Sequence, residues 1–237
     1  MNLKYIRTRN KKALVVVAHP DDEAYGMGGT LHKLLQIGFI VRVLVCYSSC
    51  PLDMDRGVER MERYYGYHKQ VCYSPREFWT YVPDQLQLSA LNHSSRDENP
   101  TRVFQLEPEI RKTVHEVNPL LVFTHSSCDL DEEHQVVADA VRTALRPQNF
   151  LTRSKVPDIL TFHVPGCTVG RPFSPSVFVA LDENNVNVKL KAALRYGERT
   201  ESHPCSSRSL KSSASHYGVL MGSAYAEAFE LESLRFY

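Results

Sequence analysis

Ala13-Leu-Val-Val-Val-Ala-His-Pro-Asp-Asp-Glu-Ala-Tyr-Gly-Met-Gly-Gly-Thr-Leu31 is the stretch that decides the fold of this chain. Its apolar run, 14–18, predicts a strand buried on both faces, as in a parallel sheet. One imidazole and three consecutive carboxylates follow at once, and burying unpaired charges costs several kcal/mol. A divalent cation would remove that cost, and His19 with Asp21 or Asp22 offers a suitable ligand set. The stretch therefore predicts a metal site at a strand end.

An ordinary strand-to-helix turn is the alternative for these residues. Asp21 or Asp22 would then cap a helix that begins near Glu23. We favour the site, because the carboxyl edge of the strands is where open α/β sheets bind their ligands. One acid is enough for a cap, and this turn carries three acids and a histidine.

Strand and helix patterns alternate along the rest of the chain. Apolar runs predict strands at 14–18, 40–46, 120–124 and 159–164. Amphipathic patterns predict helices at 31–36, 56–65, 108–117 and 134–145. Alternation of this kind is typical of βαβ units, so we predict an α/β fold with a mostly parallel sheet. Residues 66–104, with a loop at 89–101, and residues 165–176 are expected to be irregular, and such long loops are usually functional.

Size and composition suit one domain over residues 1–237. The formal net charge of +1 gives no electrostatic footprint for nucleic acid. We find no apolar run long enough to span a bilayer and no signal peptide, and therefore expect a cytoplasmic protein. The six cysteines are scattered and include no C-x-x-C pair, which indicates reduced thiols.

A second polar cluster follows the predicted strand 120–124. His125 comes first, and acids then lead to His134 in the first turn of a predicted helix. Because parallel strands end at one edge of a sheet, His19, Asp22 and His134 are expected to converge. Two imidazoles and one carboxylate leave a coordination position open, as a catalytic zinc requires. Taken singly, His134 also suits an exposed helix position, and His125 suits a strand end bonded to a neighbouring acid.

Several motifs resemble the PIG-L/LmbE-like family of zinc-dependent N-acetyl-sugar deacetylases, in its bacterial branch that modifies glycans. Ala18-His-Pro-Asp-Asp-Glu23 is similar to the family signature. The other similar motifs are Arg56-x-x-Glu59, Val82-Pro-Asp-Gln-x-x-Leu88, Asp129-Leu-Asp-Glu-Glu-His134, His203-Pro204 and Gly222-x-x-Tyr-Ala-Glu-Ala-Phe-Glu230. The resemblance runs from about residue 13 to residue 236, which would be the catalytic core.

This resemblance implies a Rossmann-like fold and hydrolysis of an acetamido group on a sugar or glycoconjugate precursor. It implies one Zn²⁺ per chain, or another divalent metal, with His19, Asp22 and His134 as ligands. Asp21 would be the general base. Amide hydrolysis fits a metal site, since a bound metal activates water and polarises the carbonyl.

The chain departs from the family pattern near its last ligand. Glu133 stands where Asp is usual, and Asp131 stands where many members have His or Asn. In members with His, that residue polarises the substrate carbonyl. A second oxyanion donor must therefore come from elsewhere, and His125 and His203 are the candidates. We favour His203 slightly, because a strand-end His125 is also suited to supporting the metal shell.

Sugar hydroxyls favour carboxylate or guanidinium partners, for which Arg56 and Asp84 are the candidates. A surface charge and a turn residue are the alternatives for these two. Cys205 and Tyr217 occupy positions where the glycan branch usually has Arg. We expect a small-molecule N-acetyl sugar or glycoconjugate as partner; neither the particular sugar nor the oligomeric state follows from the sequence.

Two other functions compete with the deacetylase. Two His and one carboxylate also form the facial triad of non-haem iron oxygenases, although that triad normally belongs to other folds. A sugar- or nucleotide-binding protein with weakened catalysis on the same fold is the second, favoured by the changes at Asp131 and Glu133. Metal content distinguishes iron from zinc, and acetate release distinguishes an enzyme from a binder.

Overall fold

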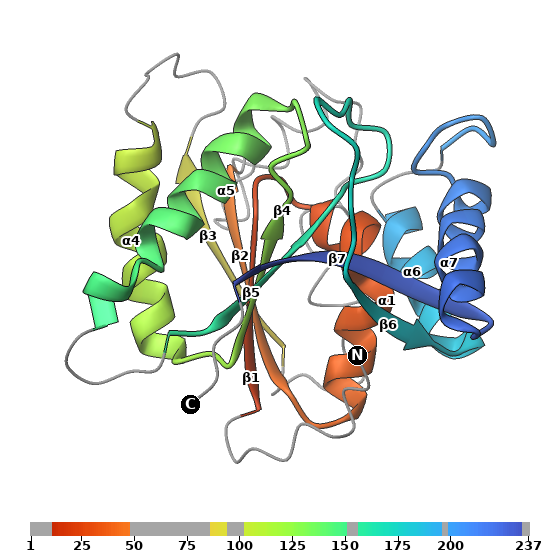
Figure 1. Cartoon of the computed structure of the whole chain (residues 1–237), viewed down its shortest axis with the longest axis horizontal. Coiled ribbons are helices and arrows are strands. Elements are labelled where there is room, and N and C mark those ends of the chain that lie inside the picture. Colours follow the sequence, from red (N-terminus) through yellow and green to blue (C-terminus); the bar gives the residue numbers. More distant parts are fainter. Residues whose placement is uncertain (1–10, 48–85, 94–101, 151–155, 196–198, 234–237) are drawn as a thin grey trace.

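The computed structural model describes residues 11–47, 86–93, 102–150, 156–195 and 199–233. A seven-stranded sheet forms its centre (Figure 1), in the order β3-β2-β1-β4-β5-β7-β6. The strands are β1 Lys12–Val17, β2 Ile40–Tyr47, β3 Leu86–His93, β4 Leu121–His125, β5 Asp158–Phe162, β6 Val177–Leu181 and β7 Tyr225–Ser233. The helices are α1 Asp22–Gln36, α4 Arg102–Val117, α5 Glu132–Ala144, α6 Glu183–Arg195 and α7 Ser207–Met221, with a short 3₁₀ helix at Pro147–Phe150.

The sheet is mostly parallel, which confirms the predicted α/β fold. The first five strands in the sheet order run parallel, with Val15 of β1 opposite Val43 of β2 and Phe123 of β4. Strand β7 is antiparallel to both β5 and β6. The strand order changes direction between β1 and β4, the position at which Rossmann-like sheets bind ligands.

Alternate residues of β1 serve two separate cores. Val15 and Val17 pack with α1, α6 and α7, whereas Leu14 and Val16 pack with α4 and α5. Figure 1 shows these two groups of helices on opposite faces of the sheet. Burial of both faces explains why β1 is apolar from Ala13 to Val17 and carries no polar alternation there.

The four predicted strands are confirmed within two residues at either end, but three strands are missing from the prediction. Strand β3 occupies Leu86–His93, so the expected loop at 89–101 is wrong for residues 89–93. It is an end strand of the sheet, where polar residues are tolerated. Helix α4 begins at Arg102, six residues before Pro108, which lies inside it. The predicted helix at 56–65 lies outside the described residues.

Cysteine placement agrees with reduced thiols: Cys46, Cys128, Cys167 and Cys205 are free. Cys50 and Cys72 lie outside the described residues. Among the described helices, none combines the length and apolar character needed to cross a membrane.

Helix α1 is kinked at Met27, whose φ is −144°. Glu227 of β7 caps the second half, since its carboxylate accepts the Gly29 N–H at 3.1 Å and the Thr30 N–H at 2.6 Å. The first half packs closely on the sheet, because a Cβ at Gly26 would lie 2.2 Å from Phe162 Cδ2. The kink and the glycine thus let α1 lie directly against the strand ends.

Gly26→Ala is expected to lower the free energy of unfolding by about 1–3 kcal/mol, the usual cost of overpacking. Phe162 is a buried β5 side chain with no space to retreat. Urea unfolding measures the effect, with Gly28→Ala as the matched control, because the nearest atom to a Cβ there, Lys189 Cγ, is 3.2 Å away and not 2.2 Å. Equal stability of the two variants would contradict the close packing.

Candidate metal centre and active site

Two strand ends bring the predicted metal ligands together. His19 follows β1, and Asp22 opens α1. His134 is the third residue of α5, the helix that follows β4. Because β1 and β4 are parallel neighbours, both connections leave the sheet at the same edge.

Three ligand atoms form a nearly equilateral triangle. Asp22 Oδ2 lies 3.5 Å from His19 Nδ1 and 3.5 Å from His134 Nε2. The two imidazole nitrogens are 3.3 Å apart. Tetrahedral zinc with bonds of about 2.0–2.1 Å separates its ligand atoms by roughly 3.3–3.4 Å. The spacing and the chemistry of this donor set therefore fit a zinc ion.

The electrostatics of the cluster favour added positive charge. Burial opposes ionisation of Asp22, but the charges of His134 and His125 outweigh burial and hold its pKa well below the usual value. Burial likewise lowers the pKa of His19, whereas hydrogen bonds to Asp22 and Glu133 raise it to about 10. Buried carboxylates thus create a negative potential that a divalent cation neutralises.

In both His19 and His134, the ring nitrogen outside the ligand triangle lies close to a carboxylate. Asp129, 1% exposed, lies 2.7 Å from His134 Nδ1. Glu133 Oε2 lies 2.5 Å from His19 Nε2. Such partners fix the orientation of metal-binding histidines and raise their basicity. Both acids belong to the motif at 129–134, but the sequence alone does not show which histidine each acid pairs with. Glu133 and His19, for example, are 114 positions apart in the chain.

Glu133→Gln is expected to weaken metal affinity by about 10- to 100-fold, the usual effect of losing an outer-shell partner. The amide keeps the size of the side chain but removes the charge that orients His19. Competition with a chelator measures the affinity. Glu132→Gln, at an exposed neighbouring acid, is the control and should bind metal like wild type. Unchanged affinity in both variants would contradict this role.

Asp131 caps helix α5. Its Oδ1 accepts the backbone N–H groups of Glu133 at 3.0 Å and of His134 at 3.2 Å. This capping explains how an acid is used where many family members have His or Asn. The side chain holds the first turn that carries His134.

Asp21 stands beside the cluster without capping α1. Its side chain makes no cap hydrogen bond, whereas Asp22 turns back to accept the His19 N–H at 2.8 Å. Burial, together with the charges of Asp22 and Glu23, raises the pKa of Asp21 well above its usual value. A carboxylate in this state is suited to accepting a proton. The capping alternative for Asp21 and Asp22 is therefore not the arrangement found.

His125, the less favoured of the two candidate oxyanion donors, lies in the interior of the protein. It is fully buried, and its ring stacks on His134 with centroids 3.9 Å apart. Its Nε2 accepts the Ala18 N–H at 2.9 Å and lies 3.4 Å from Asp22. This buried position favours the alternative role for His125, support of the metal ligands, over that of an oxyanion donor.

His203 lies in the segment before α7 and is partly exposed. Its Nδ1 accepts the Cys205 N–H at 3.0 Å, which leaves the proton of a neutral imidazole on Nε2. Burial, with the nearby charge of Asp21, raises the pKa of Cys205 to about 11, so this segment borders the site. Arg56 and Asp84 lie outside the described residues.

Arg199 is a neighbour of the site that sequence reasoning missed. Its charge acts on both Tyr25 and Asp21. In the sequence it stands only four residues before His203, in a segment with no apolar periodicity to mark it.

A family model described as PIG-L: GlcNAc-PI de-N-acetylase matches residues 14–145. The uncharacterised deacetylase YaiS of Escherichia coli K12 is 24% identical over 193 residues, covering 79% of this chain and 91% of YaiS. The N,N′-diacetylchitobiose deacetylase of Pyrococcus horikoshii aligns with a TM-score of 0.65 and 18% identity, covering 94% of this chain and 84% of that one. The A40926 pseudoaglycone deacetylase Dbv21 aligns with a TM-score of 0.70 and 16% identity, covering 94% and 97%.

Proposed function

The chain belongs to the PIG-L family of GlcNAc-PI de-N-acetylases, and from this we propose a metal-dependent hydrolase that removes the acetyl group from an N-acetylated amino sugar or glycoconjugate precursor. The observation that carries this proposal is the triangle of His19, Asp22 and His134 with Asp21 beside it. Structural neighbours named as deacetylases of N,N′-diacetylchitobiose and of the A40926 pseudoaglycone support a sugar substrate.

His19, Asp22 and His134 would hold Zn²⁺, which when bound lowers the pKa of a water and polarises the acetamido carbonyl. Asp21 accepts the proton of that water as its oxygen attacks the carbonyl carbon. Asp21 then delivers the proton to the nitrogen as the C–N bond breaks, giving acetate and a free amine. Its raised pKa suits both transfers.

His203 is the oxyanion donor in this proposal, because its Nε2 keeps a proton while Nδ1 is engaged by Cys205. Arg56 and Asp84 are proposed to bind the sugar hydroxyls. The guanidinium of arginine and the carboxylate of aspartate can each bind a polar group through two hydrogen bonds.

His203→Ala is expected to lower kcat by about 10²- to 10³-fold, with metal content and KM nearly unchanged. The lost interaction would form only as charge develops on the carbonyl oxygen. Steady-state kinetics with metal analysis measures both quantities. His216→Ala, at an exposed α7 histidine, is the control. If His203→Ala keeps the wild-type kcat, His203 is not the oxyanion donor. The metal or a backbone N–H would then polarise the carbonyl.

The proposal is tested by screening the zinc-loaded protein for acetate release across N-acetylated sugars and their glycosides. Release that depends on zinc and stops on chelation supports the deacetylase. Tight sugar binding without release would favour the catalytically weakened binder. Iron in the purified protein, with no gain from zinc, would favour the oxygenase.

A further inference from the structure

A small cavity lies between α1, α6, α7 and β7. It is on the β5–β7 side of the cluster of His19, Asp22 and His134. We infer that it is a subsite for a short hydroxyl-bearing arm carried by the acetamido sugar. This inference rests on the proposed function and adds to it the part of the substrate that the cavity selects.

Size limits what the cavity can take. Its volume is about 40 Å³, and a single water needs roughly 10–15 Å³ on this measure. A group of two or three non-hydrogen atoms therefore fits. A hydroxymethyl or hydroxyethyl group has this size.

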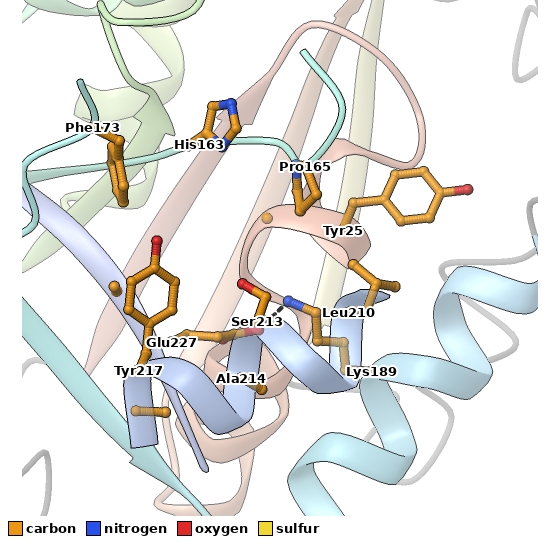
Figure 2. A pocket seen from close by; sticks show the side chains of 13 residues that line it. Tyr25, His163, Pro165, Phe173, Lys189, Leu210, Ser213, Ala214, Tyr217 and Glu227 are labelled. Carbon is orange, nitrogen blue, oxygen red and sulfur yellow. Dashed lines mark hydrogen bonds and ion pairs between the residues drawn. The ribbon is translucent and has the colours of Figure 1, made fainter. Parts of the chain in front are cut away.

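A buried ion pair forms the floor of the cavity. Lys189 and Glu227 are each 4% exposed, and Lys189 Nζ lies 2.6 Å from Glu227 Oε1. Figure 2 shows the Lys189 ammonium extending from α6 toward the centre of the lining residues. An ammonium has three N–H donors, and within the described part of the chain Lys189 makes this one hydrogen bond. The other donors favour an oxygen in the cavity.

Aromatic rings and hydroxyl groups line the walls. His163 and Phe173 lie with ring centroids 5.9 Å apart, and Tyr217 and Ser213 come from α7 (Figure 2). Such walls suit carbon–hydrogen surfaces, while the Ser213 hydroxyl and the Lys189 ammonium suit an oxygen. A neutral arm with one hydroxyl satisfies both requirements.

The cavity borders the proposed reaction centre. His163, in its wall, lies with Nε2 3.3 Å from the Cys167 carbonyl oxygen, and the Cys167 thiol is 3.8 Å from His134 Nδ1. Gly26, also in the wall, is four residues beyond Asp22 on α1. The anomeric carbon of an N-acetylhexosamine adjoins the carbon that bears the acetamido group. In this proposal the group attached there enters the cavity.

The test compares two glycosides of N-acetylglucosamine, the 2-hydroxyethyl and the propyl glycoside, which have arms of equal length and differ only in that a methyl group replaces the terminal hydroxyl. Wild type is expected to favour the hydroxyethyl substrate by about tenfold or more in kcat/KM, because the propyl arm leaves buried donors unpaired. Ser213→Leu fills the cavity and should remove the preference. Ser212→Leu, at the exposed neighbouring position, should keep it.

Calorimetric binding of the corresponding glucosaminides, the deacetylated products, measures the same preference without turnover. Lys189→Met with Glu227→Gln removes both charges together and should also abolish the preference. Equal kcat/KM and equal affinity for the two arms in wild type would overturn the subsite. Absent acetate release with retained preference in binding would instead count against the deacetylase and leave the subsite supported.

Discussion

An Asp21→Asn variant is expected to release acetate about 10²- to 10⁴-fold more slowly than wild type while keeping its fold and its metal. The amide has the shape of the carboxylate but accepts no proton at neutral pH. Metal retention is expected because Asp22 faces His19 and His134, and Asp21 makes no contact in the triangle of ligand atoms.

Activity, metal content and thermal unfolding are measured on the same preparation of Asp21→Asn. Asp139→Asn is the matched control, since Asp139 is an exposed acid on α5 that pairs with Arg142. Loss of metal together with activity would show that Asp21 is a ligand, and the roles of the two acids would be exchanged. Full activity of Asp21→Asn would show that a group other than Asp21 transfers the proton.

His134→Ala and His19→Ala are each expected to reduce metal content from close to one equivalent to near zero, with activity lost in proportion. Each substitution leaves two ligands, fewer than the three that a catalytic zinc site uses. The remaining carboxylate of Asp22 also loses one of its three close imidazole neighbours.

Elemental analysis after dialysis measures the metal, and circular dichroism checks the fold. His115→Ala, at an exposed position of α4, is the control and should bind metal like wild type. Full metal retention in both ligand variants would refute this site. Loss in His134→Ala alone would place the metal in a different triangle, the nearby group of His125, Asp129 and His134.

The central fold follows from local patterns. Residues 14–18 are apolar because β1 is covered on both faces, and the same reasoning located β2, β4 and β5. The convergence of His19, Asp22 and His134 was also predictable, since parallel neighbours end at one edge of a sheet. Strand β7 was not, because its pairing with β5 and β6 depends on side chains distant in the sequence.

What the sequence determined by itself was the residue types at the two strand ends and the sheet edge on which they meet. Only the tertiary structure decided how each side chain is used. His125 and His203 are the same residue type, yet the His125 ring stacks on His134, whereas His203 keeps its Nε2–H donor beside the site. Glu133 became the partner of His19 across 114 positions. Such roles depend on packing and hydrogen bonds between segments far apart in the chain, which no local pattern encodes.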